Sequence, residues 1–158
     1  LEPTRLNKVL QETMNDLKEI LDEKQATVQS QGLPTVPVVP VQFRQLFINL
    51  LGNSVKYSRD GVPPVITITS ARVPAGNSTL AGWKISFADN GIGFEQQYEQ
   101  KIFQIFQRLH GRSEYSGTGI GLAICKKIVL NHNGTISAIG KPGQGAVFNI
   151  FVPDSTNG

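Results

Sequence analysis

The chain has 158 residues, of which 39% are hydrophobic and 17% are charged, and this predicts one globular domain spanning residues 1–158. The formal net charge is only +3 and the Lys and Arg residues are scattered, which argues against nucleic-acid binding. No apolar run approaches the roughly 20 residues of a membrane span, and no signal peptide precedes the domain, so we expect a cytoplasmic domain without membrane contact. The absence of an initiator Met before Leu1 favours a fragment of a longer protein, whose remainder leaves room for a membrane anchor.

The first half of the sequence predicts two helices separated by a strand. In residues 4–24 the apolar side chains recur with helical spacing, which predicts one amphipathic helix. Residues 26–30 alternate in polarity as an edge strand does, and the proline-rich stretch 31–40 reads as a non-helical connector. Residues 41–57 predict a long second helix. Its buried face should carry Phe43, Leu46, Phe47, Leu50, Leu51 and Val55.

The second half predicts two pairs of strands around a further helix. Residues 65–72 and 83–88 read as strands, and residues 135–139 and 146–152 as the closing pair. Between the pairs lie a polar segment and a helix that ends near residue 131, with the single cysteine, Cys125, on its apolar face in a packing role. This order predicts a two-layer α/β sandwich, in which helices cover one face of a mixed sheet.

Two glycine clusters bracket the segment around which the chain is organised, from Asp89 to Leu122. The first, Asp-Asn-Gly-Ile-Gly (89–93), follows a strand, so Asp89 can point its carboxylate into a cleft and accept a hydrogen bond from an exocyclic amine such as that of adenine. The second, Gly-Thr-Gly-Ile-Gly-Leu (117–122), opens a helix. Glycine allows close backbone approach, and a helix N-terminus stabilises an anion, so the second cluster predicts a phosphate site.

Two familiar nucleotide-binding motifs do not fit these clusters. A Walker loop needs Gly-x4-Gly-Lys followed by Ser or Thr, and the sequence contains no such string. The dinucleotide fingerprint needs Gly-x-Gly-x-x-Gly between a strand and a helix. The first cluster leads into a polar segment instead of a helix, and the second has the wrong glycine spacing.

The helix predicted for residues 41–57 carries polar residues on one side. Asn49 and Asn53 are four residues apart and therefore share a face, and Lys56 is adjacent. Because Asn disfavours a helix by roughly half a kcal/mol relative to Ala, two aligned Asn residues suggest a polar site. The alternative, left open by the sequence, is that both side chains cap buried backbone groups.

Four motifs, in this order along the whole chain, resemble those of the catalytic ATP-binding domain of sensor histidine kinases. Residues 49–58 resemble its N box, residues 89–93 its G1 box, the phenylalanines in residues 101–108 its F box, and residues 117–122 its G2 box. Residues 143–148 fit the terminal glycine turn of that domain. Residues 106–111, together with residues 117–129, are similar to phytochrome-like members. The resemblance implies the GHKL fold of gyrase, the large heat-shock chaperone and mismatch-repair ATPases, with about five strands covered on one face by about three helices.

The resemblance also implies roles for individual residues. Asn53 is expected to coordinate Mg²⁺ through its amide oxygen, assisted by Asn49, as suits a hard ion that keeps several waters. Lys56 is expected to neutralise phosphate charge, Tyr57 to pack beside the adenine, and Asp89 to accept from the adenine amine.

The remaining implied roles concern the two glycine clusters and the segment between them. Gly91 and Gly93 are expected to keep the cleft open, residues 95–116 to form a lid, and Arg108 to reach the γ-phosphate. With Arg108, the catalytic group comprises Asn49, Asn53 and Lys56. The full ATP-binding set implied by the resemblance is Asn49, Asn53, Lys56, Tyr57, Asp89, Gly91, Gly93, Phe103, Gly117, Thr118, Gly119, Gly121 and Leu122.

One departure from hydrolysing relatives bears on the mechanism. Those relatives have Glu at the position of Asn49, where it activates water. An Asn side chain cannot act as a general base, so we expect little attack of water on ATP. In a histidine kinase the nucleophile is an imidazole on another domain, and the catalytic task is positioning and charge neutralisation.

The phosphoacceptor histidine is expected to lie outside this chain. Family acceptors precede an acidic residue and, a few residues on, a Pro. His110 and His132 lack this context and read as surface or capping residues. The expected partners are therefore the protein's own dimerisation and phosphoacceptor domain and, through its histidine, a response-regulator receiver domain. Two alternatives are a GHKL kinase that acts on protein serine and a nucleotide-binding module without chemistry.

Overall fold

The computed structural model describes residues 1–77, 79–104 and 121–154 of the chain. At its centre is a five-stranded sheet in the order β2-β4-β5-β7-β6. The parallel pairing of β2 with β4 is combined with three antiparallel pairings, so the sheet is mixed, as predicted. The strands are β2 (Thr27–Ser30), β4 (Val65–Val73), β5 (Gly82–Asp89), β6 (Thr135–Lys141) and β7 (Gly145–Pro153).

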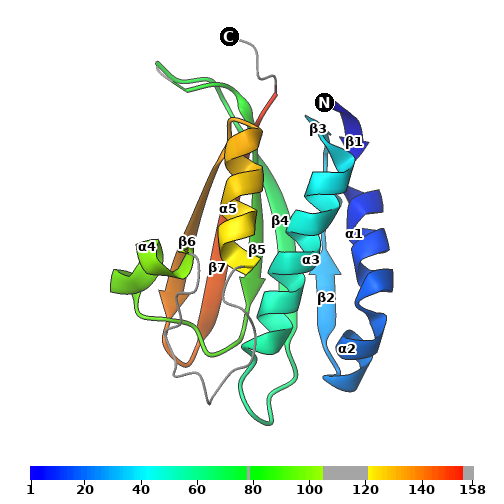
Figure 1. Ribbon diagram of the computed structural model, residues 1–158, viewed down its shortest axis with the longest axis vertical. Helices are drawn as coiled ribbons and strands as arrows, with labels where there is room; N and C mark the ends of the chain where they lie inside the picture. Colours follow the sequence, from blue (N-terminus) through cyan, green and yellow to red (C-terminus); the bar gives the residue numbers. More distant parts are fainter. Residues whose placement is uncertain (78, 105–120, 155–158) are drawn as a thin grey trace.

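In the described part of the chain, three long helices lie on one face of this sheet (Figure 1). They are α1 (Leu6–Asp16), α3 (Pro40–Lys56) and α5 (Gly121–Asn131). Alternate side chains of the strands, such as Ile68, Ile85 and Ile150, are fully buried beneath the helices. This arrangement confirms the predicted two-layer α/β sandwich. Shorter helical turns, η1 (Gln96–Tyr98) and α4 (Glu99–Ile102), follow β5.

Helix α3 forms the middle of the helical layer. Pro40 occupies its first turn, where a missing N–H leaves no intrahelical hydrogen bond unmade. The whole apolar stripe predicted from the sequence is buried, and the rings of Phe47 and Phe87 pack edge to face with their centres 5.1 Å apart. This packing fixes α3 against β5, the strand that ends at Asp89.

The N-terminal region differs from the single helix predicted for residues 4–24. The first residues form a strand, β1 (Glu2–Arg5), which pairs antiparallel with β3 (Thr35–Val38) in a separate two-stranded sheet. The helix therefore begins only at Leu6. Periodicity within either segment cannot reveal this pairing, because it joins residues far apart in the sequence.

The same region is also broken in the middle. Helix α1 ends at Asp16, and α2 (Lys18–Glu23) follows after Leu17, whose backbone leaves helical geometry at φ −101° and ψ 13°. Ile20, whose spacing continues the apolar stripe of residues 4–24, lies beyond this break in α2 and is 38% exposed. Asp16 accepts two hydrogen bonds from Arg44 on α3, at 2.9 and 2.8 Å, which ties the end of α1 to the neighbouring helix.

Side chains cover the outer edge of β6. The Gln96 side chain accepts a hydrogen bond from Gly140 N at 2.9 Å and donates one to Ala138 O at 3.0 Å. The Glu99 carboxylate accepts from Ala138 N at 3.0 Å. These groups satisfy the edge backbone much as another strand would. The first residues of the predicted lid, 95–116, are therefore anchored to the sheet.

His132 connects the end of α5 to the start of α3. Its Nε2 atom accepts a hydrogen bond from Val39 N at 3.0 Å, so the ring proton lies on Nδ1 and is donated to Ile128 O at 2.8 Å. The ring also packs edge-on against Phe43, with centres 4.9 Å apart. At 2% exposed, His132 is not the surface residue that the sequence allowed; the capping alternative is the one observed.

Candidate nucleotide site

Asp89 is the last residue of β5, and three hydrogen bonds hold its carboxylate. Oδ1 accepts from Gly91 N at 2.9 Å and from Ala146 N at 3.2 Å, and Oδ2 accepts from Ser54 Oγ at 2.9 Å. Burial raises the pKa of the Asp89 carboxyl, while the bonds from Gly91, Ser54 and Ala146 oppose that rise. Oδ2 retains a second lone pair, so the carboxylate can accept a further hydrogen bond from a ligand.

The polar side of α3 carries Asn49 and Asn53, both half-buried, and the exposed Lys56. The Asn49 side chain is used by the protein, because Oδ1 accepts from Gln45 Nε2 at 2.9 Å and Nδ2 lies 3.4 Å from Gly121 O. Among the described residues, no hydrogen bond engages the Asn53 side chain. Asn49 therefore fits in part the alternative that these side chains bond to backbone groups, because it contacts Gly121 O. The amide oxygen of Asn53 has no such partner among the described residues and is available to a ligand.

The N-terminus of α5 lies beside this side of α3. Asn49 contacts Gly121 at the helix start, and one turn further on Cys125 Sγ lies 4.0 Å from Leu46 O. A Cβ at Gly121 would meet no atom of the described residues within 4 Å. Backbone N–H groups there favour an anion. Burial raises the pKa of the Cys125 thiol to about 12, in keeping with its predicted packing role.

Gly91 and Gly93 are required by the packing of the protein itself. A Cβ at Gly91 would lie 2.5 Å from Tyr57 O, and one at Gly93 would collide with Lys141 O. Gly93 also has φ +67°, a conformation that favours glycine. Ile92 N donates to Tyr57 O at 2.9 Å between them. The loop is therefore held between the end of α3 and the β6–β7 turn, a reason for these glycines besides the open cleft predicted from the sequence.

Three further predicted site residues are described. Tyr57 directly follows α3 and is half-buried, with Lys56 Nζ 5.4 Å from the centre of its ring. Phe103 is buried, and its ring packs edge-on against Phe148 with centres 6.3 Å apart, so its described contact lies in the core. Leu122, in the first turn of α5, packs partly against the core. Their contacts with nucleotide stay predictions.

Four predicted site residues lie outside the described part of the chain: Arg108, Gly117, Thr118 and Gly119. Most of the predicted lid, 95–116, also lies outside it, as does His110. The described residues thus bring together Asp89, the polar side of α3 and the start of α5.

The sequence reasoning missed Ser54, Asn90 and Arg59, which hold this site together. Ser54 is 3% exposed and places a hydroxyl on the apolar stripe of α3. A buried hydroxyl needs a partner, so its position on that stripe was a usable signal. Asn90 and Arg59 join two loops through hydrogen bonds. A contact between residues so far apart in the sequence cannot be predicted from a local sequence pattern.

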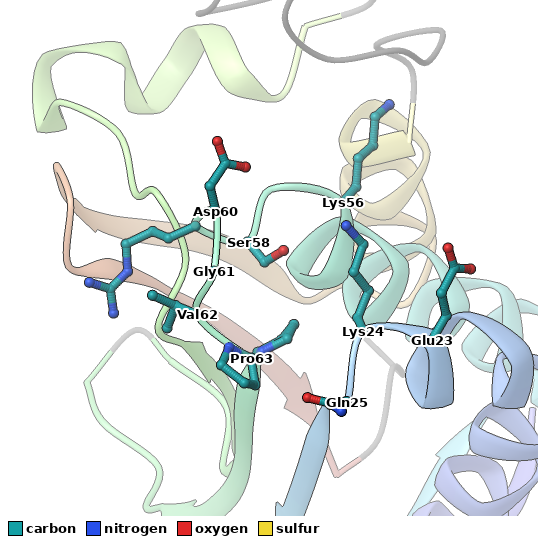
Figure 2. A pocket seen from close by; sticks show the side chains of 11 residues that line it. Glu23, Lys24, Gln25, Lys56, Ser58, Asp60, Gly61, Val62 and Pro63 are labelled. Atoms are coloured by element: carbon teal, nitrogen blue, oxygen red, sulfur yellow. The ribbon is translucent and has the colours of Figure 1, made fainter.

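An open depression of about 500 Å³ lies beside the site, between the turn after α2 and the loop that joins α3 to β4 (Figure 2). Of the predicted site residues, only Lys56 is among its described lining, so the depression is separate from the cluster around Asp89 and Asn53. Its walls combine cationic and acidic side chains, a mixture typical of a solvated surface. These are Lys24, Lys56, Arg59, Glu23 and Asp60.

The amide oxygen of Asn53 suits a hard metal ion held with few protein ligands. Among the described residues, no group of three or more His, Cys, Asp or Glu side chains could hold a metal ion. Mg²⁺ prefers oxygen ligands and keeps several waters, so one amide oxygen together with water and phosphate oxygens matches its preference.

None of the described helices is long and apolar enough to cross a membrane.

Residues 38–156 match the family described as "Histidine kinase-, DNA gyrase B-, and HSP90-like ATPase". The chain belongs to this ATPase family. The matched span contains α3, Asp89 and α5, the elements that form the candidate site. The resemblance inferred from the four sequence motifs is therefore confirmed.

Similar curated proteins are sensor kinases and phytochromes. The chain is 41% identical over 150 residues to cyanobacterial phytochrome A of Nostoc sp. and 37% identical over 150 residues to the phytochrome-like protein Cph1 of Synechocystis sp.. Each match covers 95% of this chain and 19% of the relative. The adaptive-response sensory kinase SasA of Rippkaea orientalis is 31% identical over 90% of this chain and 36% of its own length. The chain thus spans a fifth to about a third of these relatives.

Solved structures show the same fold. The mycobacterial sensor histidine kinase MprB matches with a TM-score of 0.79 at 21% identity, over 98% of this chain and 97% of that one. Full-length ShkA in complex with AMPPNP matches with a TM-score of 0.79 at 26% identity, over 99% of this chain and 32% of that one. These likenesses confirm the predicted GHKL-type fold.

Proposed function

We propose that this chain is the ATP-binding catalytic domain of a two-component sensor histidine kinase. It transfers the γ-phosphoryl group of ATP to a histidine on a separate dimerisation domain. The observation that carries the proposal is the half-buried Asp89 carboxylate, bonded to Ser54 of α3, with capacity for one more hydrogen bond. Family membership and the AMPPNP complex of the similar kinase ShkA support it.

The residues divide into a part for the base and a part for the phosphates. Asp89 accepts from the adenine amine, and Tyr57 packs beside the base. On α3, Asn53 offers its amide oxygen to Mg²⁺, and Asn49, one turn earlier, assists. The ion, when bound, supplies positive charge that offsets the charge of the transferring phosphoryl group.

The proposed phosphate contacts come from three places in the chain. Lys56 adds positive charge at the end of α3. The start of α5 at Gly121 provides backbone N–H groups beside Asn49. Arg108 is assigned to the γ-phosphate. Asn49 cannot act as a general base, so we expect little attack by water, and the nucleophile is the incoming imidazole.

The partners follow from this chemistry. A histidine kinase catalytic domain implies a dimerisation and phosphoacceptor domain, which provides the histidine nucleophile. We infer that a response-regulator receiver domain then takes the phosphoryl group from that histidine, and that the reaction takes place in the cytoplasm. The described His132 is excluded as acceptor, because both ring nitrogens are engaged inside the fold.

Transphosphorylation tests this proposal. The chain is mixed with Mg²⁺, γ-labelled ATP and the helical acceptor domain of the same sensor protein. Label should appear on the acceptor domain in a bond that acid hydrolyses and alkali does not, as expected for phosphohistidine. Acid-stable label on a serine would support the serine-kinase alternative, and nucleotide binding without any transfer would support a binding module.

A further inference from the structure

The Asn90 side chain ends strand β5 directly after Asp89. In the β4–β5 ladder, Asp89 is paired with Ile66, and Val65 is the next residue of β4. Asn90 Oδ1 accepts from Val65 N at 2.9 Å, and Asn90 Nδ2 donates to Pro63 O at 3.2 Å. The side-chain amide thus satisfies backbone groups that a longer strand would have paired. The main chain is then free to turn into the loop that begins at Gly91.

Arg59 holds the same turn from the other side. Its Nε atom donates to Asn90 O at 2.9 Å. The loop between α3 and β4, whose Ser58 and Pro63 are labelled in Figure 2, is therefore bonded to both the backbone and the side chain of Asn90. Together with the bond from Ile92 N to Tyr57 O, these contacts fix the path of the chain on both sides of Gly91.

The position of the Asp89 carboxylate depends on that path. Gly91 N donates to Asp89 Oδ1, so a shift of the turn removes one of the bonds that orient the carboxylate. Hydrogen bonds weaken steeply with misalignment, and an oriented acceptor is needed to read an exocyclic amine.

We infer that Asn90 and Arg59 are positioning residues that set the specificity of the site for adenine over a base without the amine. The inference rests on the proposed function, since it assumes that Asp89 reads the base. Neither residue touches the base; each acts through the turn that holds Asp89.

The test compares ADP with inosine diphosphate, which carries an oxygen in place of the adenine amine. Dissociation constants for both are measured by calorimetry on the whole chain. The wild-type chain should prefer ADP. Asn90→Ala should weaken ADP binding about tenfold and change inosine diphosphate binding little, so that the preference collapses. Arg59→Ala should act in the same direction, and Arg59→Lys, which can still donate to Asn90 O, should recover part of the preference.

Asn149→Ala is the matched control. The Asn149 side chain accepts from Ser86 Oγ at 2.6 Å between β5 and β7, away from the turn, so both affinities should stay unchanged. Thermal unfolding of every variant is followed in parallel. If Asn90→Ala and Arg59→Ala weaken ADP and inosine diphosphate by the same factor, the residues serve only stability and the inference is overturned.

The failure of the inference is distinguishable from that of the proposed function. The Asp89→Asn variant shows how far the preference for ADP over inosine diphosphate falls when the carboxylate itself is removed. A wild-type chain that binds both nucleotides equally would overturn the assignment of Asp89 to the base and the inference with it. A preference that Asp89→Asn abolishes but that Asn90→Ala and Arg59→Ala retain would overturn the inference alone.

Discussion

Ser54 Oγ donates a hydrogen bond to Asp89 Oδ2 over 2.9 Å and so joins the buried face of α3 to the end of β5. On the same helix, Asn49 contacts Gly121 at the start of α5, and Asn53 lies one turn further along α3. The residues assigned to the base and those assigned to the metal are therefore carried by packed elements with a shared core. Such a site needs little rearrangement of these elements when nucleotide binds.

The affinity for ADP should fall as the pH is lowered through the pKa of Asp89, which burial raises above its ordinary value of 3.8. The adenine amine binds the ionised carboxylate, so protonation competes with nucleotide. The nucleotide phosphate itself titrates near pH 6, as phosphate monoesters do, to about the same extent with any variant. The advantage of wild type over Asp89→Asn should therefore shrink as the pH falls, so that the two titrations converge at low pH, and parallel curves would contradict the assignment.

Ser54→Ala should move that pH dependence upward. The hydrogen bond from Ser54 favours the ionised carboxylate, so its loss raises the pKa of Asp89 further. In the absence of nucleotide, the stability of the folded chain changes with pH in the direction opposite to the ADP affinity. The folded chain holds the Asp89 proton more tightly than the unfolded chain, so the free energy of unfolding falls as the pH rises through the folded pKa. Denaturant titrations at several pH values, with Asp89→Asn as reference, measure this effect.

Asn53→Ala should abolish phosphoryl transfer while leaving ADP binding without metal nearly unchanged. The reason is spatial, because the proposal assigns the amide oxygen of Asn53 to Mg²⁺ and the carboxylate of Asp89 to the base. Transfer rates and metal-free dissociation constants are measured on the same preparations. A stable Asn53→Ala variant that phosphorylates the acceptor at the normal rate would remove Asn53 from the metal site.

Asn49→Glu should raise hydrolysis of ATP in the absence of an acceptor. The substitution restores the carboxylate of hydrolysing relatives, which can act as a general base toward water. Phosphate release is followed with and without Mg²⁺, and Asn49→Gln serves as the uncharged control of the same length. Equal hydrolysis by the two variants would argue against a water-attack position at residue 49.

The Gln96 side chain should protect backbone amides on the edge of β6. Gln96→Ala removes the acceptor of Gly140 N, so exchange of that amide with deuterium should accelerate. Ala138 N is bonded to Glu99 and should respond to Glu99→Ala instead. Unchanged protection at both amides in both variants would show that the side chains do not close this edge.

His132→Ala should lower the free energy of unfolding by about 2–4 kcal/mol, because it opens a cavity beside Phe43 and leaves Val39 N without its acceptor. Lys127→Ala, at an exposed position of α5, should change it by less than about 0.5 kcal/mol. Chemical denaturation measures both. Similar values for the two variants would contradict a structural role for the imidazole.

The sequence predicted those parts of the fold in which one segment carries its own signal. The stripe of α3 and the alternation of the central strands follow from local periodicity. The two glycine clusters predicted the end of β5 and the start of α5. The pairing of β1 with β3 joins two segments that are each ambiguous alone, so it was missed. The break at Leu17 was missed too, because the apolar stripe continues through it.

The candidate site shows the same division. Asp89 and Asn53 could be singled out as candidates because a carboxylate after a strand and aligned amides on a helix are locally unusual. Ser54 reads as an ordinary helical residue until β5 is placed beside it. Asn90 and Arg59 matter through bonds between loops, which depend on the full tertiary structure.

The most direct test of the central claim is the dissociation constant of ADP for wild type and for Asp89→Asn, measured near neutral pH. The substitution keeps the size of the side chain but replaces an ionised acceptor by a neutral amide. The loss of a charged hydrogen bond of about 1.5–3 kcal/mol predicts binding weaker by about tenfold or more. An unchanged dissociation constant would place the adenine elsewhere and contradict the account.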